Sequence, residues 1–241
     1  MYMNTNLSSV ALKDKAKEKL TGHYGFLIGI SVLLGFISFF ISFFILILIP
    51  TTTIASMIIA ECMTFIISVF IGVFTVGISL IYLKLANGNT ATFSDLFYGF
   101  NHNIQRSLTI SLVVNAVSMI PTIAYTIPYQ LFLHTGQEIY LFLMLPCLAI
   151  ALVIFVPLSL GLSQSYYLLL DFPSKSASDI LSLSFKVMKG HKARLFYIEI
   201  SFIPLILLGT ISCIGMLWIS PYIKMTLTNF FFDIMKTEQK I

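Results

Sequence analysis

Ionisable side chains inside long apolar stretches are the residues of this chain with the most scope for chemistry, because a charge at the centre of a bilayer costs about 2.5–3.5 kcal/mol. Three residues qualify, and they are Glu61, Glu199 and Lys224. If the segments that carry Glu199 and Lys224 form an antiparallel hairpin, the two side chains can form an intramembrane ion pair; otherwise each extends to the interface. Glu61 is read either as an interfacial or seam carboxylate or as a proton or cation site.

Small and polar residues recur every three or four positions in two of the apolar segments, 54–85 and 107–129. This spacing places them on one helix face. Such a face is either a packing seam, with hydroxyl bonds between helices worth about 0.6 kcal/mol each, or the wall of a polar cavity. The residues of this predicted polar seam are Glu61, Thr64, Ser68, Thr75, Ser111, Asn115, Ser118 and Thr122.

The densest basic cluster adjoins a predicted amphipathic helix at 176–190, in which Ile180, Leu183 and Val187 share one face. Basic residues beside such a helix suit anionic lipid headgroups, at about 1 kcal/mol per residue. The rest of the sequence forms no groove-sized basic surface, so nucleic acid is not an expected partner. The predicted headgroup contacts are Lys186, Lys189, Lys192 and Arg194.

Other kinds of chemistry find no support in the sequence. It contains no phosphate loop, nucleophile elbow, zincin motif or dinucleotide-binding fingerprint. Cys62, Cys147 and Cys213 lie in or beside apolar runs at unrelated spacings, as small buried hydrophobes do. We therefore expect no catalytic residue, no metal and no cofactor.

Composition requires lipid as the solvent for much of the chain. Of its 241 residues, 58% are hydrophobic and 10% are charged, whereas a soluble domain carries about 25% charged residues. The mean hydropathy is +0.95. The fold class we predict is all-α, a polytopic transmembrane helical bundle with lipid bilayer around it.

The last apolar run is either two short spans, which gives six spans in all, or one span plus a surface helix, which gives five. The positions of the basic residues decide between the two. Every Lys and Arg lies before residue 20, in 84–106, in 175–194, or from Lys224 onward. Six spans place all of these segments, and both termini, in the cytoplasm. The predicted spans are 25–49, 54–85, 107–129, 139–170, 195–210 and 213–234, and the predicted cytoplasmic surface helices are 7–22, 93–104 and 176–190.

An internal repeat underlies this layout. Residues 77–95 align without a gap on residues 161–179 at a constant offset of 84 (161 − 77), and glycine, serine, tyrosine, leucine and aspartate positions coincide. Thr92 to Asp95 and Ser176 to Asp179 both have capping-box spacing, which opens a helix. We predict three repeats, each an amphipathic helix followed by a helical hairpin; the third is inferred from layout.

Five segments together resemble one known family: Ile81–Gly88 (IYLKLANG), Thr92–Phe100 (TFSDLFYGF), Met188–Phe196 (MKGHKARLF), Ile200–Ile203 (ISFI) and Ile214–Tyr222 (IGMLWISPY). The chain resembles the bacterial integral membrane proteins catalogued as domain of unknown function 975. The resemblance covers nearly the whole chain and implies a bacterial cytoplasmic (cell) membrane location. It implies no established activity and no catalytic residues. One departure, Pro204, is expected to bend the fifth span.

From these patterns we expect a non-enzymatic, multi-pass membrane protein that acts in membrane transport or envelope defence through the polar seam. The alternative is a scaffold or immunity-type interaction protein, whose basic surface helices bind anionic lipids at the cytoplasmic face or a partner membrane protein. Either function is compatible with a homo-oligomer.

Overall fold

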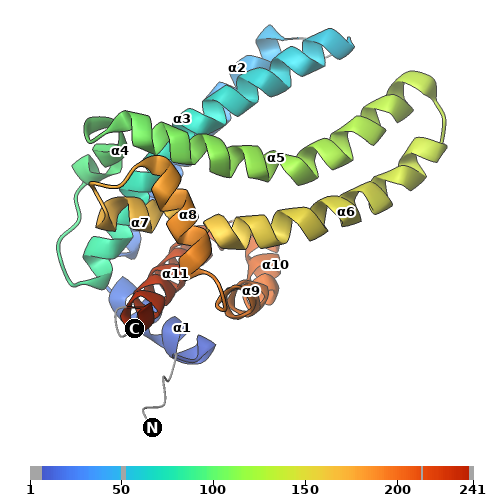
Figure 1. Cartoon of the computed structure of the whole chain (residues 1–241). Helices are drawn as coiled ribbons and strands as arrows, with labels where there is room; N and C mark the ends of the chain where they lie inside the picture. Colours follow the sequence, from blue (N-terminus) through green and yellow to red (C-terminus); the bar gives the residue numbers. More distant parts are fainter. Residues whose placement is uncertain (1–6, 50–52, 213, 239–241) are drawn as a thin grey trace.

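A computed structural model describes residues 7–49, 53–212 and 214–238. Within these ranges the chain is helical and has no strand, as predicted. Figure 1 shows hairpins that diverge from a common junction near the two termini. The elements are α1 (Ser9–Leu20), α2 (Tyr24–Leu48), α3 (Ile54–Ala86), η1 (Phe93–Phe97), α4 (Tyr98–Asn101), α5 (Ile104–Thr135), α6 (Ile139–Leu162), α7 (Ser165–Asp171), α8 (Ala177–Val187), α9 (Lys192–Ile200), α10 (Ile203–Ile211) and α11 (Met216–Glu238).

Five helical segments are long and apolar enough to cross a membrane, which fits a multi-pass membrane protein. Helix α11 occupies most of the sixth predicted span but is not among them, and it carries Lys224, Asp233 and Lys236. Large apolar side chains on α2, α5 and α6 are exposed, as lipid-facing residues are. The five segments are Tyr24–Leu48, Ala55–Ala86, Ile104–Thr135, Ile139–Asp171 and Lys192–Ile211.

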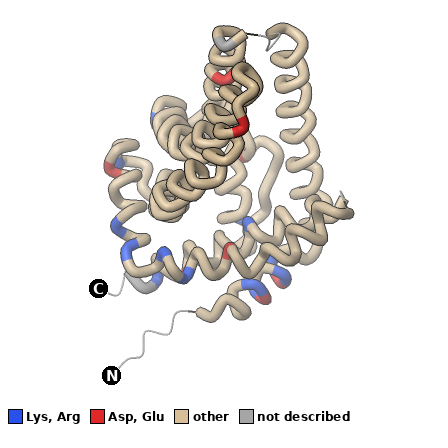
Figure 2. Tube along the Cα trace, turned by 90° about the vertical axis from the view of Figure 1, so that its right-hand side faces the viewer, with Lys and Arg blue, Asp and Glu red and all other residues tan. Residues whose placement is uncertain are grey.

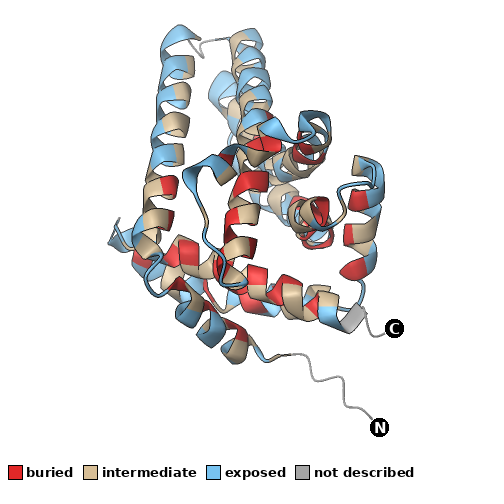
Figure 3. Ribbon diagram, turned by 90° about the vertical axis from the view of Figure 1, so that its left-hand side faces the viewer, coloured by how far each residue is buried: buried red, intermediate tan, exposed pale blue. Residues whose placement is uncertain are grey.

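The core lies at the junction of the hairpins. Figure 3 shows buried residues gathered there, while α2 and the turn ends of the long hairpins are mostly exposed. Helix α3 contacts α5, η1, α4, α7 and α11, and α11 also contacts α1 and α2. The helices therefore hold together at one end, which is the end where the basic segments lie. We call this the basic end, and the opposite end of each hairpin the turn end.

The N-terminal helix α1 is a structural part of this junction. Its apolar residues Leu12, Ala16 and Leu20 form a stripe that is fully buried. The stripe faces protein and not lipid, because α1 packs on α11. Leu12, for example, belongs to the same cluster as Phe202 and Phe230.

The two segments that align in the sequence each end at a helix cap, before η1 in the first and before α8 in the second. Asp95 accepts a hydrogen bond from the Thr92 N–H (2.8 Å), and Ser176 Oγ accepts one from the Asp179 N–H (3.2 Å), so both predicted caps are present. Gly77, in the first segment, allows close approach: a Cβ there would overlap the Leu96 carbonyl. In the second segment, the carbonyl of Gly161 accepts a bond from Ser184 Oγ (2.7 Å).

Prolines explain where the helices differ from the predicted spans. Helix α5 continues through Pro121 and Pro128 to Thr135, beyond the predicted end at 129, as membrane helices tolerate internal proline. The fifth span is bent as expected, because α9 ends at Ile200 and Pro204 stands in the first turn of α10. A proline is tolerated there since the first turn needs no N–H donor. The fourth span is also interrupted, between α6 and α7.

Candidate functional site

The predicted polar seam lies between α3 and α5, and its half nearer the basic end is closed. Ser111 is fully buried, and a Cβ added to Gly72 would lie 2.8 Å from Ser111 Oγ and 3.0 Å from Asn115 Nδ2. The absent glycine side chain thus lets the two helices approach here. This part of the seam is packing and not a cavity.

Three of the eight seam residues donate their side-chain hydrogen bonds within their own helix. Asn115 Nδ2 donates to the Ser111 carbonyl (2.8 Å), Ser68 Oγ to the Phe65 carbonyl (2.7 Å) and Ser118 Oγ to the Val114 carbonyl (3.0 Å). The expected hydroxyl bonds between α3 and α5 are not made by these three residues. Shape, and not hydrogen bonding, holds this contact together.

Towards the turn end, α3 and α5 separate and leave a groove of about 750 Å³. Its walls are mainly apolar, with Phe65, Ile66 and Met119 among them, and Glu61 and Thr122 of the predicted seam also line it. The volume lies in the range of small-molecule sites, about 300–1,000 Å³. Figure 1 shows the divergence of the two hairpins that creates the space.

The groove contains residues that the sequence interpretation missed. Thr126, Gln130 and His134 line it, and they follow the predicted Thr122 at four-residue spacing along α5. Gln130 and His134 lie beyond residue 129, where the third span was predicted to end, but α5 continues to Thr135. Gln130 Oε1 is buried and has no hydrogen-bond partner among the described residues. An unpartnered buried acceptor favours a ligand that donates a hydrogen bond or carries positive charge.

The other seam residues lie outside the groove. Thr64 and Ser118 are exposed, and Ser68 lies between the groove and the closed half. Thr75 lines a separate cavity nearer the basic end, together with Tyr166 and Tyr167. The predicted seam is therefore divided among three environments.

Charge is distributed unequally between the two ends of the bundle. The sequence has no Lys or Arg between Leu20 and Leu83 or between Ser107 and Ser174, and Glu61 and Glu138 are its only acidic residues near the turn ends of the first two hairpins. Figure 2 shows the basic residues away from these ends. The entrance to the groove is thus an acidic region.

Glu199 and Lys224 line one cavity of about 140 Å³, as their predicted hairpin arrangement requires. They do not form an ion pair: the ion pairs of the described residues are Lys17–Asp14, Lys84–Asp95 and Arg194–Asp233. Glu199 is exposed on α9, whereas Lys224 is partly buried on α11. The structure brings the two side chains to one cavity without pairing them.

Three of the four predicted headgroup contacts surround a shallow hollow of about 450 Å³ beside Gly190. Lys186 and Lys189 are exposed, whereas Lys192 Nζ donates to the Pro157 carbonyl (3.0 Å). Arg194 departs from the prediction, because it pairs with Asp233 and donates to the Leu7 carbonyl (2.6 Å).

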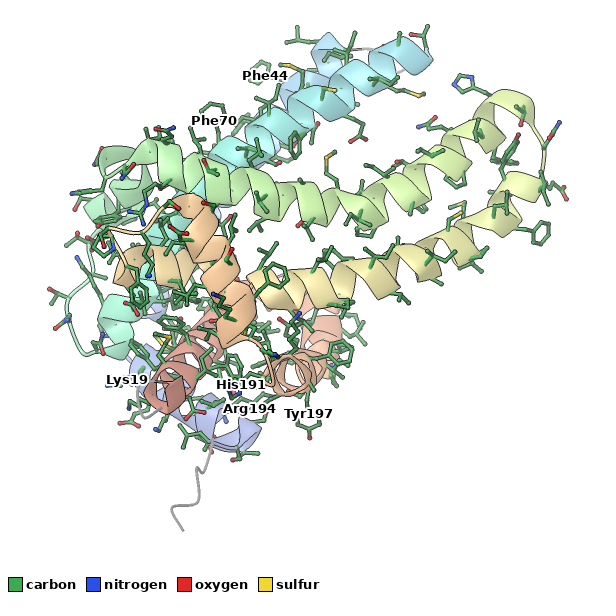
Figure 4. The ribbon with its side chains drawn as sticks, viewed as in Figure 1. Lys19, Phe44, Phe70, His191, Arg194 and Tyr197 are labelled. Atoms are coloured by element: carbon green, nitrogen blue, oxygen red, sulfur yellow. The ribbon has the colours of Figure 1, made fainter. Side chains whose placement is uncertain are left out.

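Arg194 therefore joins protein elements instead of facing lipid. Figure 4 places it beside α11, while Tyr197 on the same helix points outward and Phe44 and Phe70 project from the first hairpin. The guanidinium connects α9 to α11 and to the start of α1. Of the four predicted headgroup contacts, only the three lysines still fit that prediction.

A further ion pair fixes the connection after α3. Lys84 Nζ lies 2.6 Å from Asp95 Oδ1. Burial raises the pKa of Asp95, but hydrogen bonds from Lys84 and Thr92 outweigh burial and hold the pKa below its ordinary value of 3.8. The pKa of Asp179 is also lowered, by hydrogen bonds from Ser176. Neither carboxylate belongs to a metal site, since no cluster of three or more His, Cys, Asp or Glu residues occurs in the ranges described.

Comparison with known proteins agrees with the sequence motifs. The family described as "Protein of unknown function (DUF975)" matches residues 3–238. The chain belongs to this family. No curated protein and no solved structure matches it significantly. The DUF975 match covers every element described above, so the groove and the basic hollow both lie within the family's shared region.

Proposed function

We propose that this DUF975 protein is a non-enzymatic membrane component that takes up a cationic amphipathic molecule in the α3–α5 groove, in membrane transport or in envelope defence. The observation that carries the proposal is the groove itself, about 750 Å³ with mainly apolar walls and the acidic side chain of Glu61. Catalysis is not part of the proposal, because the groove holds no nucleophile paired with a base.

The chemistry of the occupant follows from the lining. Apolar walls favour a hydrocarbon or aromatic portion, at about 25 cal/mol per Å² removed from water. Glu61, Gln130 Oε1 and the nearby Glu138 favour a cation, and no Lys or Arg competes with it. An amphipathic amine or a cationic peptide combines both features. An ordinary zwitterionic lipid lacks the net positive charge that the acidic entrance selects.

The proposed topology is six spans in three repeats, in the bacterial cytoplasmic membrane with both termini cytoplasmic. The placement of every Lys and Arg supports it, because a five-span chain would leave Lys236 and Lys240 outside. The turn ends, and with them the mouth of the groove, then face outward. A molecule arriving from outside meets the acidic end first.

A susceptibility assay tests this function. Cells that lack the protein are complemented with wild type, with Glu61→Leu/Gln130→Leu, or with the control Thr64→Leu/Ser118→Leu, which makes the same kind of exchange on α3 and α5 outside the groove. Growth is measured against a cationic amphiphile and an uncharged amphiphile of the same chain length. We expect wild type and the control to change susceptibility to the cationic amphiphile and not to the uncharged one. The groove variant, present in the membrane at the same abundance, should behave like the strain without the protein. Equal behaviour of all three proteins would refute the proposal.

The hollow at Lys186, Lys189 and Lys192 supports a second candidate, a scaffold or immunity-type protein that binds anionic lipid or a partner membrane protein at its cytoplasmic face. Two of these lysines are exposed around an open space of about 450 Å³. Under this reading, Lys186→Glu/Lys189→Glu abolishes function while the groove variant leaves it intact. The same susceptibility assay distinguishes the two.

A further inference from the structure

A second cavity, of about 210 Å³, lies between α2, α3 and α11, near the basic end and away from the groove. Its polar lining consists of Ser31, Tyr82, Ser220 and Lys224. Ser220 and Lys224 are four residues apart and so lie on the same face of α11. The rest of the lining is aliphatic, with Leu27 and Ile81 among its residues.

Three of these polar groups are hydrogen-bond donors that the protein does not satisfy. Within the described part of the chain, Lys224 Nζ, Tyr82 OH and Ser220 Oγ make no hydrogen bond, and Lys224 makes no ion pair. Tyr82 is only 3% exposed. By contrast, Ser31 Oγ donates to the Leu27 carbonyl (2.9 Å) and leaves its lone pairs free. Donors that line a partly enclosed cavity without a protein partner favour a ligand that accepts their hydrogen bonds.

No acidic residue lines this cavity. Glu199 lines only the neighbouring cavity of about 140 Å³, which shares Lys224 and Tyr82 with the first. Among the described residues, Lys224 is thus the one charged residue in the lining of the larger cavity, beside three hydroxyls and hydrocarbon. Such a lining repels cations and suits a negatively charged oxygen, which accepts charge-assisted hydrogen bonds.

The cavity also lies near the ends of α2 and α3 at the basic end. Tyr82 is four residues from the end of α3 at Ala86, and Ser31 is seven residues from the start of α2 at Tyr24. At 1.5 Å per residue these positions are about 6 Å and about 10 Å from the helix ends. A phosphate at the basic-end surface of the membrane needs to enter by only this distance.

We propose that this cavity binds an oxyanion of the phosphate class, with Lys224 as its counter-charge and Tyr82 and Ser220 as hydrogen-bond donors. The phosphate comes either from an anionic phospholipid, whose acyl chains contact the aliphatic lining, or from free phosphate. Its volume of about 210 Å³ exceeds the ≈ 30 Å³ that one water occupies in the liquid. The site is independent of the α3–α5 groove and of the function proposed for it.

Thermal unfolding of the full-length protein, purified and delipidated in an uncharged detergent, tests this site. The probes are phosphatidylglycerol, phosphatidylcholine with the same acyl chains, and inorganic phosphate. Lys224→Met removes the charge and keeps the length of the side chain. Lys236→Met is the matched control, because it removes an exposed lysine from the same helix. Apparent affinities come from the rise in midpoint temperature with ligand concentration.

We expect phosphatidylglycerol, and not phosphatidylcholine, to raise the midpoint of wild type and of the Lys236 variant, with affinity at least about tenfold lower for Lys224→Met. If inorganic phosphate reproduces the whole shift and Lys224→Met removes it, free phosphate is the ligand. If Lys224→Met does not fold, Tyr82→Phe/Ser220→Ala keeps the charge and must weaken the response. No response in wild type, an equal response in Lys224→Met, or no weakening in the double variant overturns the proposal.

Discussion

The contact between Arg194 and Asp233 joins the N-terminal helix to the last hairpin, and breaking it should loosen that helix. Asp233 accepts hydrogen bonds from Arg194 and from the Leu7 N–H (3.2 Å), and Arg194 also donates to the Leu7 carbonyl. Lys13 adds a bond of 2.8 Å to Ser201 Oγ. The substitution Asp233→Asn keeps the size of the side chain and removes its charge.

The burial of this ion pair determines how much stability Asp233→Asn should lose. The side chains of Arg194 and Asp233 are 20% and 11% exposed. Removing one partner of a buried pair costs about 3–5 kcal/mol. The remaining exposure reduces this cost, because water screens the charge left behind, so we expect about 2–3 kcal/mol for Asp233→Asn. The control pair, Lys17 and Asp14, is 63% exposed on both sides and should contribute below about 0.5 kcal/mol.

A double-mutant cycle measures the contact. Asp233→Asn, Arg194→Met and the double variant are unfolded with an anionic detergent in mixed micelles, and the fluorescence of Trp218, the chain's one tryptophan, reports unfolding of α11. The same cycle is run on Asp14 and Lys17. We expect a coupling free energy of at least about 1.5 kcal/mol for the first pair. A coupling no larger than that of the exposed pair would show that this contact does not hold α1.

Three further predictions concern the contact at Gly72, the Lys84–Asp95 ion pair and the membrane topology. Gly72→Leu should destabilise the protein by about 1–3 kcal/mol in the same assay, because the added atoms meet Ser111 and Asn115. Gly35→Leu is the control, because the added side chain enters open space there and should leave the stability unchanged. Because its pKa is lowered, the Asp95 carboxylate stabilises the fold above the ordinary pKa of 3.8 and loses this contribution as the pH falls through its folded-state pKa. Wild type and Asp95→Asn should therefore differ in free energy of unfolding at pH 6 and become equally stable in acid. A difference that stays constant with pH would contradict the ion pair. Single cysteines at Gln137 and Gln239 should be labelled from opposite sides of the membrane, and labelling from one side would exclude the six-span topology.

Local features of this fold were predictable from the sequence because they depend on near neighbours. The caps at Asp95 and Ser176 follow from three-residue spacing, and the bend at Pro204 follows from the missing N–H. The four-residue spacing of Leu12, Ala16 and Leu20 also indicates a stripe on α1, but spacing alone does not say whether a stripe meets lipid or protein. Its burial on α11 depends on a contact across about two hundred residues.

The candidate site was predictable only in part, because its shape depends on contacts between residues far apart in the sequence. Helical spacing identified Glu61 and Thr122, yet the divergence of α3 from α5 depends on how whole hairpins pack. Gln130 and His134 were missed because α5 continues beyond residue 129, the predicted end of the span. Arg194 was misassigned because its partner, Asp233, lies 39 residues away, and a charge pattern gives no information about such distant pairing.

Protection of Cys62 is the most direct test of the groove, because this residue lies in its lining and is exposed. With Cys147→Ser and Cys213→Ser, Cys62 is the only thiol, and its alkylation by a maleimide is followed in lipid vesicles. Dodecyltrimethylammonium, below solubilising concentrations, is compared with dodecanol. We predict that the cation slows alkylation of Cys62 at least about fivefold more than the alcohol does, and that Glu61→Gln removes the difference. Equal protection by both molecules, or a cation effect that survives Glu61→Gln, would contradict a cation-selective groove.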